Sequence, residues 1–271
     1  MSASPQAEFG ALAAAEGRAA VVTIVGGEGA AVGLKLLVRE DGSRSGGLGA
    51  AGLEEVAAQL ASELMWAERS ELHEHQGVQL FVDVTAPAPR LVIFGAVDYA
   101  MALCRLARAA GWRPVVCDPR SQFATPERFP EAEAVIAAWP QEALQRVGID
   151  RATYVAVLTH DPKLDDAALG IALRSDAAYV GAMGSRKAQE RRRERLLANG
   201  FHEGELERLA APIGLDLGAT GPEETALSVM AEVVAVRNGR AGGRLRDKQG
   251  GRIHDEDRAQ PAEPAASRES A

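Results

Sequence analysis

Four apolar runs in the middle of the chain each end in a cluster of small, polar and charged residues. The runs cover 91–94, 114–117, 154–158 and 178–180. Segments of helical character lie between the first two runs and after the third and fourth. This alternation predicts βαβ units, in which helices bury a parallel sheet on both faces. Ligands of such sheets bind beyond the carboxyl ends of the strands, so all the polar clusters lie where a ligand site is expected.

Composition narrows the class of protein. The 271 residues are 46% hydrophobic and 25% charged, which is ordinary for a soluble globular protein. A formal net charge of −8 speaks against a nucleic-acid partner. The N-terminus lacks a basic segment followed by an apolar one, and no apolar run is long enough to cross a bilayer. We therefore expect a cytoplasmic protein that does not bind membranes.

The distribution of apolar residues, glycines and prolines predicts an α/β protein with two domains. The expected segments are an N-terminal segment at 1–17, a small α/β domain at 18–86, a linker at 87–90, a Rossmann-like parallel-sheet domain at 91–239 and a disordered tail at 240–271. The linker is stiff because prolines flank Ala88, and the tail is rich in glycine and charge with almost no large apolar residue.

Several elements follow from local patterns. The small domain is expected to contain strands at 20–25, 34–38 and 78–84, turns at Asp41-Gly42 and Gly46-Gly47, and a helix spanning Leu53 to Leu64. In the larger domain we expect a faint third strand at 135–138 and Asp98 as the cap of the first helix. Thr220 and Glu223 fit a capping box that opens the last helix.

The first βα turn begins at Gly95, where dinucleotide-binding proteins carry G-x-G-x-x-G. Val97 replaces the second glycine, which lets backbone approach a pyrophosphate, and Asp98 adds a like charge. Asp118 ends the next strand 23 residues after Gly95, near the spacing of a ribose-binding acid. The architecture matches half of a Rossmann fold with impaired phosphate binding. NAD(P) binding is thus disfavoured, and an NAD(P)-dependent oxidoreductase is the alternative function.

The most unusual string runs from Thr159 to Asp166. His160 and Asp161 suit a general base with its orienting acid, a proton relay or, with Asp165, a metal-assisted hydrolase. In the structural interpretation His160 binds backbone and Asp165 caps the next helix. We favour a functional role that includes Lys163, because the string lies beside the other strand ends, and we assign no metal site.

An anion site is expected after the fourth apolar run. Its residues are Gly181, Gly184, Ser185 and Arg186. Free backbone N–H groups and the helix dipole favour an anion there, whereas the structural interpretation is a packing loop capped by Ser185. Arg120 suits a second anion contact or a partner of Asp118, and Asp216 can reach the site from a glycine-flanked loop.

Two further features are expected to be structural. Cys104 and Cys117 follow neither a redox nor a zinc pattern and read as buried small hydrophobes, with a redox or persulfide-carrying role as the alternative. The charged helix at 186–197 reads as a solvated face rather than a docking surface.

Several strings carry a family resemblance. They are Val92-Ile93-Phe94-Gly95-Ala96, Asp118-Pro119-Arg120, Phe123-Ala124, Arg128-Phe129-Pro130, Leu158-Thr159-His160-Asp161, the segment 179–186, the segment 212–219, Pro222-Glu223-Glu224-Thr225-Ala226 and Ala231-Glu232. In their order along 90–239 they resemble the XdhC/CoxI family, accessory proteins of molybdenum-containing hydroxylases such as xanthine and carbon monoxide dehydrogenases.

The resemblance implies a function and partners. It implies a chaperone, rather than an enzyme, that binds molybdenum cofactor (molybdopterin), protects it during sulfuration and delivers it to an apo-hydroxylase. The implied partners are that hydroxylase, a cysteine desulfurase and a second copy of the chain in a homodimer. A docking protein that recognises the hydroxylase without holding cofactor is a further alternative.

The N-terminal domain departs from the family pattern. Relatives usually carry a Ser-Pro-Arg-type loop and a Gly-Gly-Gly-Cys-like stretch. The corresponding positions here are 26–31 and 46–52, and they contain no cysteine. A thiol-based mechanism is therefore not transferred to this chain.

Together, these motifs predict one set of cofactor-binding residues. They are Gly95, Asp98, Asp118, Arg120, His160, Asp161, Lys163, Gly181, Gly184, Ser185, Arg186 and Asp216. Gly184, Ser185 and Arg186 are expected on phosphate, and His160 with Asp161 on the polar pterin. No catalytic residue is assigned.

Overall fold

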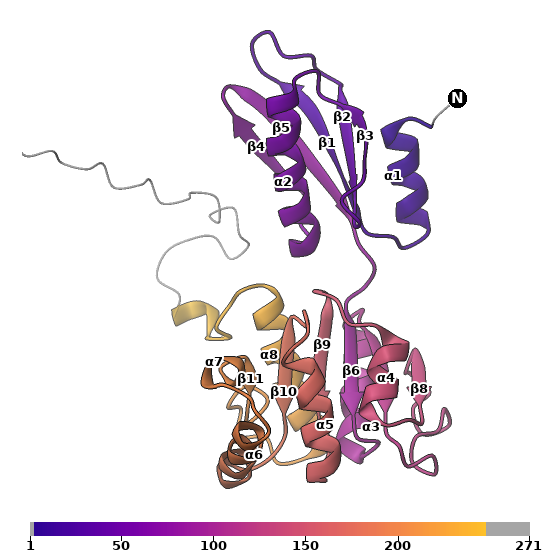
Figure 1. The fold of residues 1–271 in the computed structure, drawn as a ribbon, viewed down its shortest axis with the longest axis vertical. Coiled ribbons are helices and arrows are strands. Elements are labelled where there is room, and N and C mark those ends of the chain that lie inside the picture. Colours follow the sequence, from indigo (N-terminus) through magenta and orange to yellow (C-terminus); the bar gives the residue numbers. More distant parts are fainter. Residues whose placement is uncertain (1–2, 248–271) are drawn as a thin grey trace, which may run out of the picture.

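The computed structural model describes residues 3–247, which form two sheets joined by a short connection (Figure 1). A five-stranded sheet has the order β3-β2-β1-β5-β4, and a six-stranded sheet has the order β11-β10-β9-β6-β7-β8. The α/β class with a Rossmann-like parallel sheet is confirmed. Within the described residues, no helix combines the length and apolar character that a membrane span requires.

The N-terminal sheet is antiparallel throughout and has a helix on each face. Its elements are α1 (Pro5–Ala14), β1 (Ala19–Gly26), β2 (Lys35–Arg39), β3 (Arg44–Gly47), α2 (Ala51–Ala67), β4 (Glu71–His75) and β5 (Val78–Thr85). Successive side chains of a strand point to opposite faces. Ala20, Val22 and Ile24 of β1 therefore share a core with α2, whereas Ala19 and Val21 share one with α1.

Three of these elements differ from the expectations. Helix α1 lies in the segment 1–17, where Ser4 caps it and Pro5 opens it, but its apolar residues do not repeat on one side. Strand β3 occupies the Gly46-Gly47 turn position and pairs with β2. Strand β4 pairs with β5 but carries one apolar side chain, Leu72, among glutamates and histidines. Its sequence therefore lacks the alternation of apolar and polar residues that predicts a strand.

The C-terminal sheet is parallel in every ladder. Its elements are β6 (Arg90–Phe94), α3 (Asp98–Ala109), β7 (Arg113–Cys117), β8 (Ala134–Ile136), α4 (Pro140–Val147), β9 (Thr153–Val157), α5 (Pro162–Ala172), β10 (Tyr179–Ala182), α6 (Arg186–Ala198), α7 (Glu203–Leu206), β11 (Leu209–Ala210), α8 (Pro222–Arg237) and the 3-10 turn η1 (Leu245–Asp247). The chain runs outward from β6 to β8 and then returns to β9 beside β6. The strand order therefore reverses between β6 and β9, where doubly wound sheets bind ligands.

Both faces of this sheet are buried. Leu91 and Ile93 of β6 face a core shared with α3 and α8, whereas Val92 and Phe94 face one shared with α4, α5 and α6. Because neither face meets water, the strands have no polar alternation and appear in the sequence as the apolar runs.

Helix starts differ from the expected caps. Val97 precedes α3 without a side-chain cap, and Asp98 is the first helical residue. Gly221 precedes α8, so Thr220 and Glu223 do not form the capping box, and Glu224 accepts the Thr220 N–H instead. Asp161, not Asp165, caps α5. Proline at the first position of α8 fixes its start without a capping side chain.

Other differences concern short or terminal segments. The faint third strand is the three-residue β8, and β11 was not expected. Of the predicted tail, 240–247 contains the turn η1, and 248–271 lies outside the described residues.

The N-terminal sheet lies near the amino ends of the parallel strands (Figure 1). Glu68, at the end of α2, pairs with Arg237 at the end of α8. The guanidinium of Arg151, just before β9, lies 5.6 Å from the ring centroid of Trp66. The carboxyl edge of the parallel sheet is therefore built by 90–247 alone.

Candidate functional site

Loops from the carboxyl ends of β6, β7, β9, β10 and β11 share one edge of the parallel sheet. These loops and the helix starts that follow them carry Gly95, Asp98, Asp118, Arg120, His160, Asp161, Lys163, Gly184, Ser185, Arg186 and Asp216. The fold therefore brings these predicted residues to the edge where ligands of doubly wound sheets bind. Gly181 lies inside β10 instead.

The loops after β6 and β9 touch at Gly95. Its φ of +108° suits glycine, and a Cβ there would lie 3.0 Å from Cγ2 and 3.1 Å from the backbone N of Thr159. Phe94 O also accepts the Leu158 N–H at 2.8 Å. Close packing of the two loops therefore requires this glycine, whether or not a ligand is bound.

The carboxylate of Asp118, at the end of β7, is buried and fully engaged. One oxygen accepts the Ala96 N–H at 2.8 Å and Arg120 Nη2 at 2.7 Å, and the other accepts the N–H and Nε of Arg120 at 2.9 Å each. Burial alone would raise the pKa of Asp118, but these hydrogen bonds outweigh it and hold the pKa below its ordinary value. Asp118 therefore cannot accept ribose hydroxyls while it holds Arg120.

The loop after β9 is fixed by Thr159. Its buried hydroxyl accepts the Asp161 N–H at 3.0 Å and donates to Asp165 at 2.7 Å. Asp161 accepts the Lys163 N–H at 2.9 Å and so caps α5. His160 and the side chain of Lys163 are exposed, and within residues 3–247 His160 has no hydrogen-bond partner on its ring. The expected base–acid pair of His160 and Asp161 is therefore not assembled.

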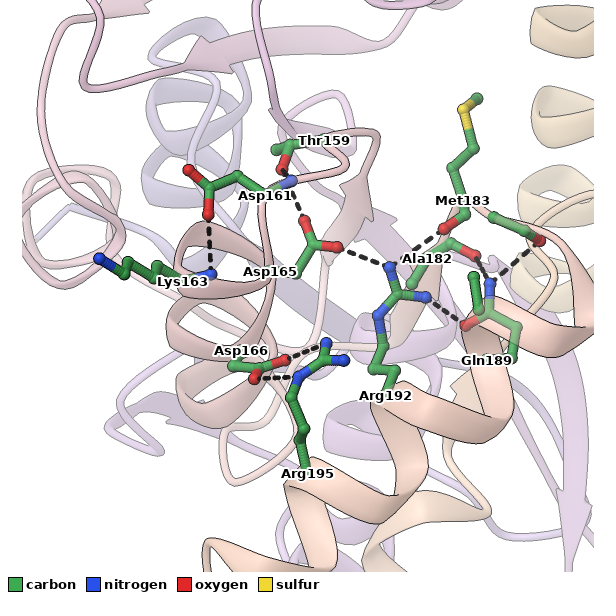
Figure 2. Close-up of polar contacts among 12 residues, drawn as sticks. Thr159, Asp161, Lys163, Asp165, Asp166, Ala182, Met183, Gln189, Arg192 and Arg195 are labelled. Carbon is green, nitrogen blue, oxygen red and sulfur yellow. Dashed lines mark hydrogen bonds and ion pairs between the residues drawn. The ribbon is translucent and has the colours of Figure 1, made fainter.

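Asp165 belongs to a buried network rather than to a metal site. Its carboxylate binds Thr159 and, at 2.6 Å, the guanidinium of Arg192 from α6 (Figure 2). Within the described part of the chain, no cluster of three or more His, Cys, Asp or Glu side chains is placed to hold a metal ion. His160, Asp161 and Asp165 thus do not gather as the metal-assisted hydrolase would require.

Arg192 joins the loop after β10 to the loop after β9. Besides Asp165, it donates to Met183 O at 3.1 Å and to Gln189, whose amide donates to Ala182 O and Gly184 O at 3.1 and 3.2 Å (Figure 2). Arg192 and Asp165 are both buried, with 4% and 3% of their surface exposed. The network therefore holds two loops of the edge in one arrangement.

The interpretation of the charged helix as a solvated face is wrong at Arg192. The signal that reveals it is the buried Leu196, four residues later and so on the same face of α6. A charged side chain on the apolar face of a helix requires a buried partner, which Asp165 supplies.

The start of α6 offers exposed donors. Gly184 has a φ of +137°, and the Ser185 hydroxyl accepts the Ala188 N–H at 3.3 Å as the helix cap. Ser185 therefore caps α6, as the structural interpretation predicts. Ser185 and Arg186 are exposed, and within residues 3–247 Arg186 has no ion-pair partner. The helix start can still meet an anion through these groups.

Gly181 and Asp216 differ in accessibility. A Cβ on Gly181 would lie 2.6 Å from Ile213 Cδ1 and 2.6 Å from the Tyr179 hydroxyl. Close packing therefore explains why this buried position is a glycine. That hydroxyl donates to Glu232, and burial together with this hydrogen bond raises the pKa of Tyr179.

Asp216 is exposed on the loop after β11.

Both thiols are inaccessible in the folded protein. Cys104 and Cys117 are fully buried, and burial raises the pKa of each to about 12. Because the thiolate is the reactive form, we expect a disulfide reagent to label neither thiol at neutral pH until the protein unfolds. Absorbance of the released thiolate with and without urea measures this. Rapid labelling of the native protein would contradict it and restore a sulfur-carrying role.

The comparisons with known proteins place residues 91–233 in one family. This stretch, more than half of the chain, matches the XdhC Rossmann domain. The chain is 33% identical over 165 residues to a Bacillus subtilis protein named as a probable subunit of xanthine dehydrogenase, covering 61% of this chain and 48% of that protein. It is 29% identical over 151 residues to the Escherichia coli molybdenum cofactor insertion chaperone PaoD, covering 56% and 41% respectively.

A solved structure shares the fold. It is described as a xanthine dehydrogenase from Bacillus halodurans and superimposes with a TM-score of 0.63 at 24% identity, over 86% of this chain and 66% of that chain. At this identity the likeness concerns the fold. The chain spans less than half the length of the two curated relatives, at 48% and 41%.

Proposed function

Because this chain belongs to the XdhC family, we propose that it is an accessory protein that binds molybdenum cofactor and inserts it into a hydroxylase of the xanthine or carbon monoxide dehydrogenase type. The observation that carries the proposal is the family match over 91–233, since that stretch builds the whole carboxyl edge. The names of relatives, which mention cofactor insertion and xanthine dehydrogenase, support it.

The chemistry of the edge suits a phosphorylated, polar cargo. The N-terminus of α6 presents backbone N–H groups, with Arg186 exposed beside Ser185, and we assign the phosphate to it. His160 and Lys163 are exposed at the neighbouring helix start and can meet the polar groups of the pterin. Asp165 and Arg192 hold these two loops together without contacting the cargo.

The alternative NAD(P)-dependent oxidoreductase is less well supported. Val97 occupies the place where backbone must approach a pyrophosphate, and Asp98 at the first position of α3 repels it. The acid that would bind a ribose diol, Asp118, is occupied by Arg120 and the Ala96 N–H. A dinucleotide would have to break these bonds to bind in the usual way.

Sulfuration in this proposal depends on a partner. Cys104 and Cys117 are buried with raised pKa values, so a cysteine desulfurase is proposed as the sulfur donor. A homodimer in the cytoplasm is proposed for the same accessory role.

The pterin content of purified protein tests the proposal. We expect protein from cells rich in molybdenum cofactor to carry pterin, and Arg186→Ala to lower that content several-fold because the phosphate loses its guanidinium. Arg191→Ala on the same helix is the matched control, exposed but five residues further from the helix start, and it should leave the content unchanged. Mass analysis after gentle purification measures both.

One result would contradict the proposal. Protein that neither carries pterin nor binds it when it is offered is not a cofactor chaperone. If that protein still captures the apo-hydroxylase, it is the docking protein of the alternative interpretation.

A further inference from the structure

The loop between β7 and β8 places two guanidinium groups against one exposed ring. The guanidinium carbon of Arg120 lies 4.9 Å from the centroid of Phe123, and that of Arg128 lies 5.7 Å from it. The loop follows the carboxyl end of β7, so the three side chains lie at the same edge as the proposed cofactor site. We refer to Arg120, Phe123 and Arg128 as the stacking platform.

Hydrogen bonds hold the two guanidinium groups and the backbone of Phe123 in place. Asp118 binds Arg120 through Nε and Nη2 at 2.9 and 2.7 Å. Arg128 donates to Ala96 O at 3.1 Å and to Phe123 O at 3.0 Å. The Phe123 N–H in turn donates to Arg120 O at 2.9 Å. The platform therefore needs no ordering when a ligand arrives.

The platform is accessible. Phe123 is 37% exposed, and the side chain of Arg120 is 47% exposed. Within residues 3–247, Nη1 of Arg120 has no hydrogen-bond partner. A planar guanidinium that a ring covers on one face and a carboxylate binds at its edge can stack with its other face.

The surrounding charges favour a ring over a phosphate. Asp118 compensates the charge of Arg120, in keeping with the pairing alternative for Arg120 rather than with a second anion contact. Asp98 lies 3.8 Å from Arg128. The hydrogen bonds that Arg120 donates to Asp118 raise the pKa of Arg120, and the nearby charge of Asp161 raises it further. Carboxylates repel a phosphate but accept hydrogen bonds from amino and ring N–H groups.

We propose that the stacking platform binds an amino-substituted planar heterocycle, a pterin or a nucleobase, by stacking it on the free face of the Arg120 guanidinium, which Phe123 supports from the other side. The proposal rests on the proposed function and deepens it, because it places the ring of the ligand at β7 and leaves the phosphate at α6. Aromatic rings and guanidinium planes are the usual stacking surfaces for bases. They recognise the face of a planar ring and accept different ring substituents.

Fluorescence titration with free pterin and, separately, with cytidine 5′-monophosphate tests the platform. Phe123→Leu and Arg120→Lys should each weaken binding about tenfold, since the first removes the ring that supports the guanidinium and the second removes the stacking plane itself. Arg174→Lys is the matched control, because Arg174 also lies on a phenylalanine, 3.9 Å from the centroid of Phe201, but belongs to no loop of the carboxyl edge. It should bind as the parent does, and thermal unfolding verifies that each variant is folded.

The outcomes separate this proposal from the function on which it rests. Loss of pterin binding in the platform variants supports a pterin ring at β7, and loss of nucleotide binding alone supports the base of a nucleotide there. Unchanged binding in Phe123→Leu and Arg120→Lys overturns the platform, and the proposed function stands if the parent still purifies with cofactor. A parent that binds neither probe and carries no cofactor overturns both.

Discussion

Replacing Arg192 by methionine will lower the free energy of unfolding by about 3–5 kcal/mol, because the carboxylate of Asp165 then remains buried without a partner. The two side chains are each 4% exposed, and the bond between Arg192 Nη2 and Asp165 Oδ2 measures 2.6 Å. Equilibrium urea denaturation measures the loss. The double variant Asp165→Asn, Arg192→Met should recover most of it, since neither charge is then buried alone and Thr159 can still donate to Asn.

The same two helices provide a control for the Arg192 prediction. Arg195 of α6 pairs with Asp166 of α5 at 2.7 Å, but these side chains are 36% and 18% exposed. Water replaces the lost bond there, so Arg195→Met should cost no more than about 1 kcal/mol. If Arg192→Met costs as little as Arg195→Met, the buried network does not hold the two loops as described.

Replacing Asp118 by alanine will destabilise the protein by about 3 kcal/mol and weaken cofactor binding. The substitution leaves the buried Ala96 N–H without an acceptor and frees Arg120, and losing charged acceptors of buried donors carries costs of this size. Urea denaturation gives the stability, and pterin content gives the binding. A variant as stable as the parent would show that these hydrogen bonds contribute nothing net.

The pH dependence of stability provides a second readout for Asp118. Its pKa is lower in the folded protein than the ordinary value of 3.8, so the unfolded chain binds the proton more readily. The stability that Asp118 contributes is therefore complete above pH 3.8 and is lost as the pH falls through the folded pKa. Asp118→Asn should lose this part of the acid dependence and keep the rest.

Long buried elements could be predicted from the sequence because burial leaves a clear pattern. The strands of the parallel sheet are buried on both faces, so each appears as an apolar run. Helix α1 and strands β4 and β11 could not be predicted in this way. Strand β4 is charged and lies at a sheet edge, and the two-residue β11 is defined by its pairing with β10. Such elements depend on their neighbours rather than on their own side chains.

The candidate site could be located from the sequence, but its internal bonds could not. Topology alone brings the ends of β6, β7, β9 and β10 to one edge. The sequence left open whether Asp118 pairs with Arg120 or with a ribose, and the structure assigns it to Arg120 and Ala96. The pairing of Asp165 with Arg192 was missed, because the partners come from different helices and the charges around Arg192 suggested a solvated face.

The proposed function places molybdenum cofactor at the carboxyl edge of this chain. The most direct measurement is the amount of pterin bound per mole of chain after gentle purification from cells rich in the cofactor. We predict that pterin accompanies the parent protein and is reduced in Arg186→Ala but not in Arg191→Ala. A parent free of pterin that also fails to bind added cofactor would contradict the claim.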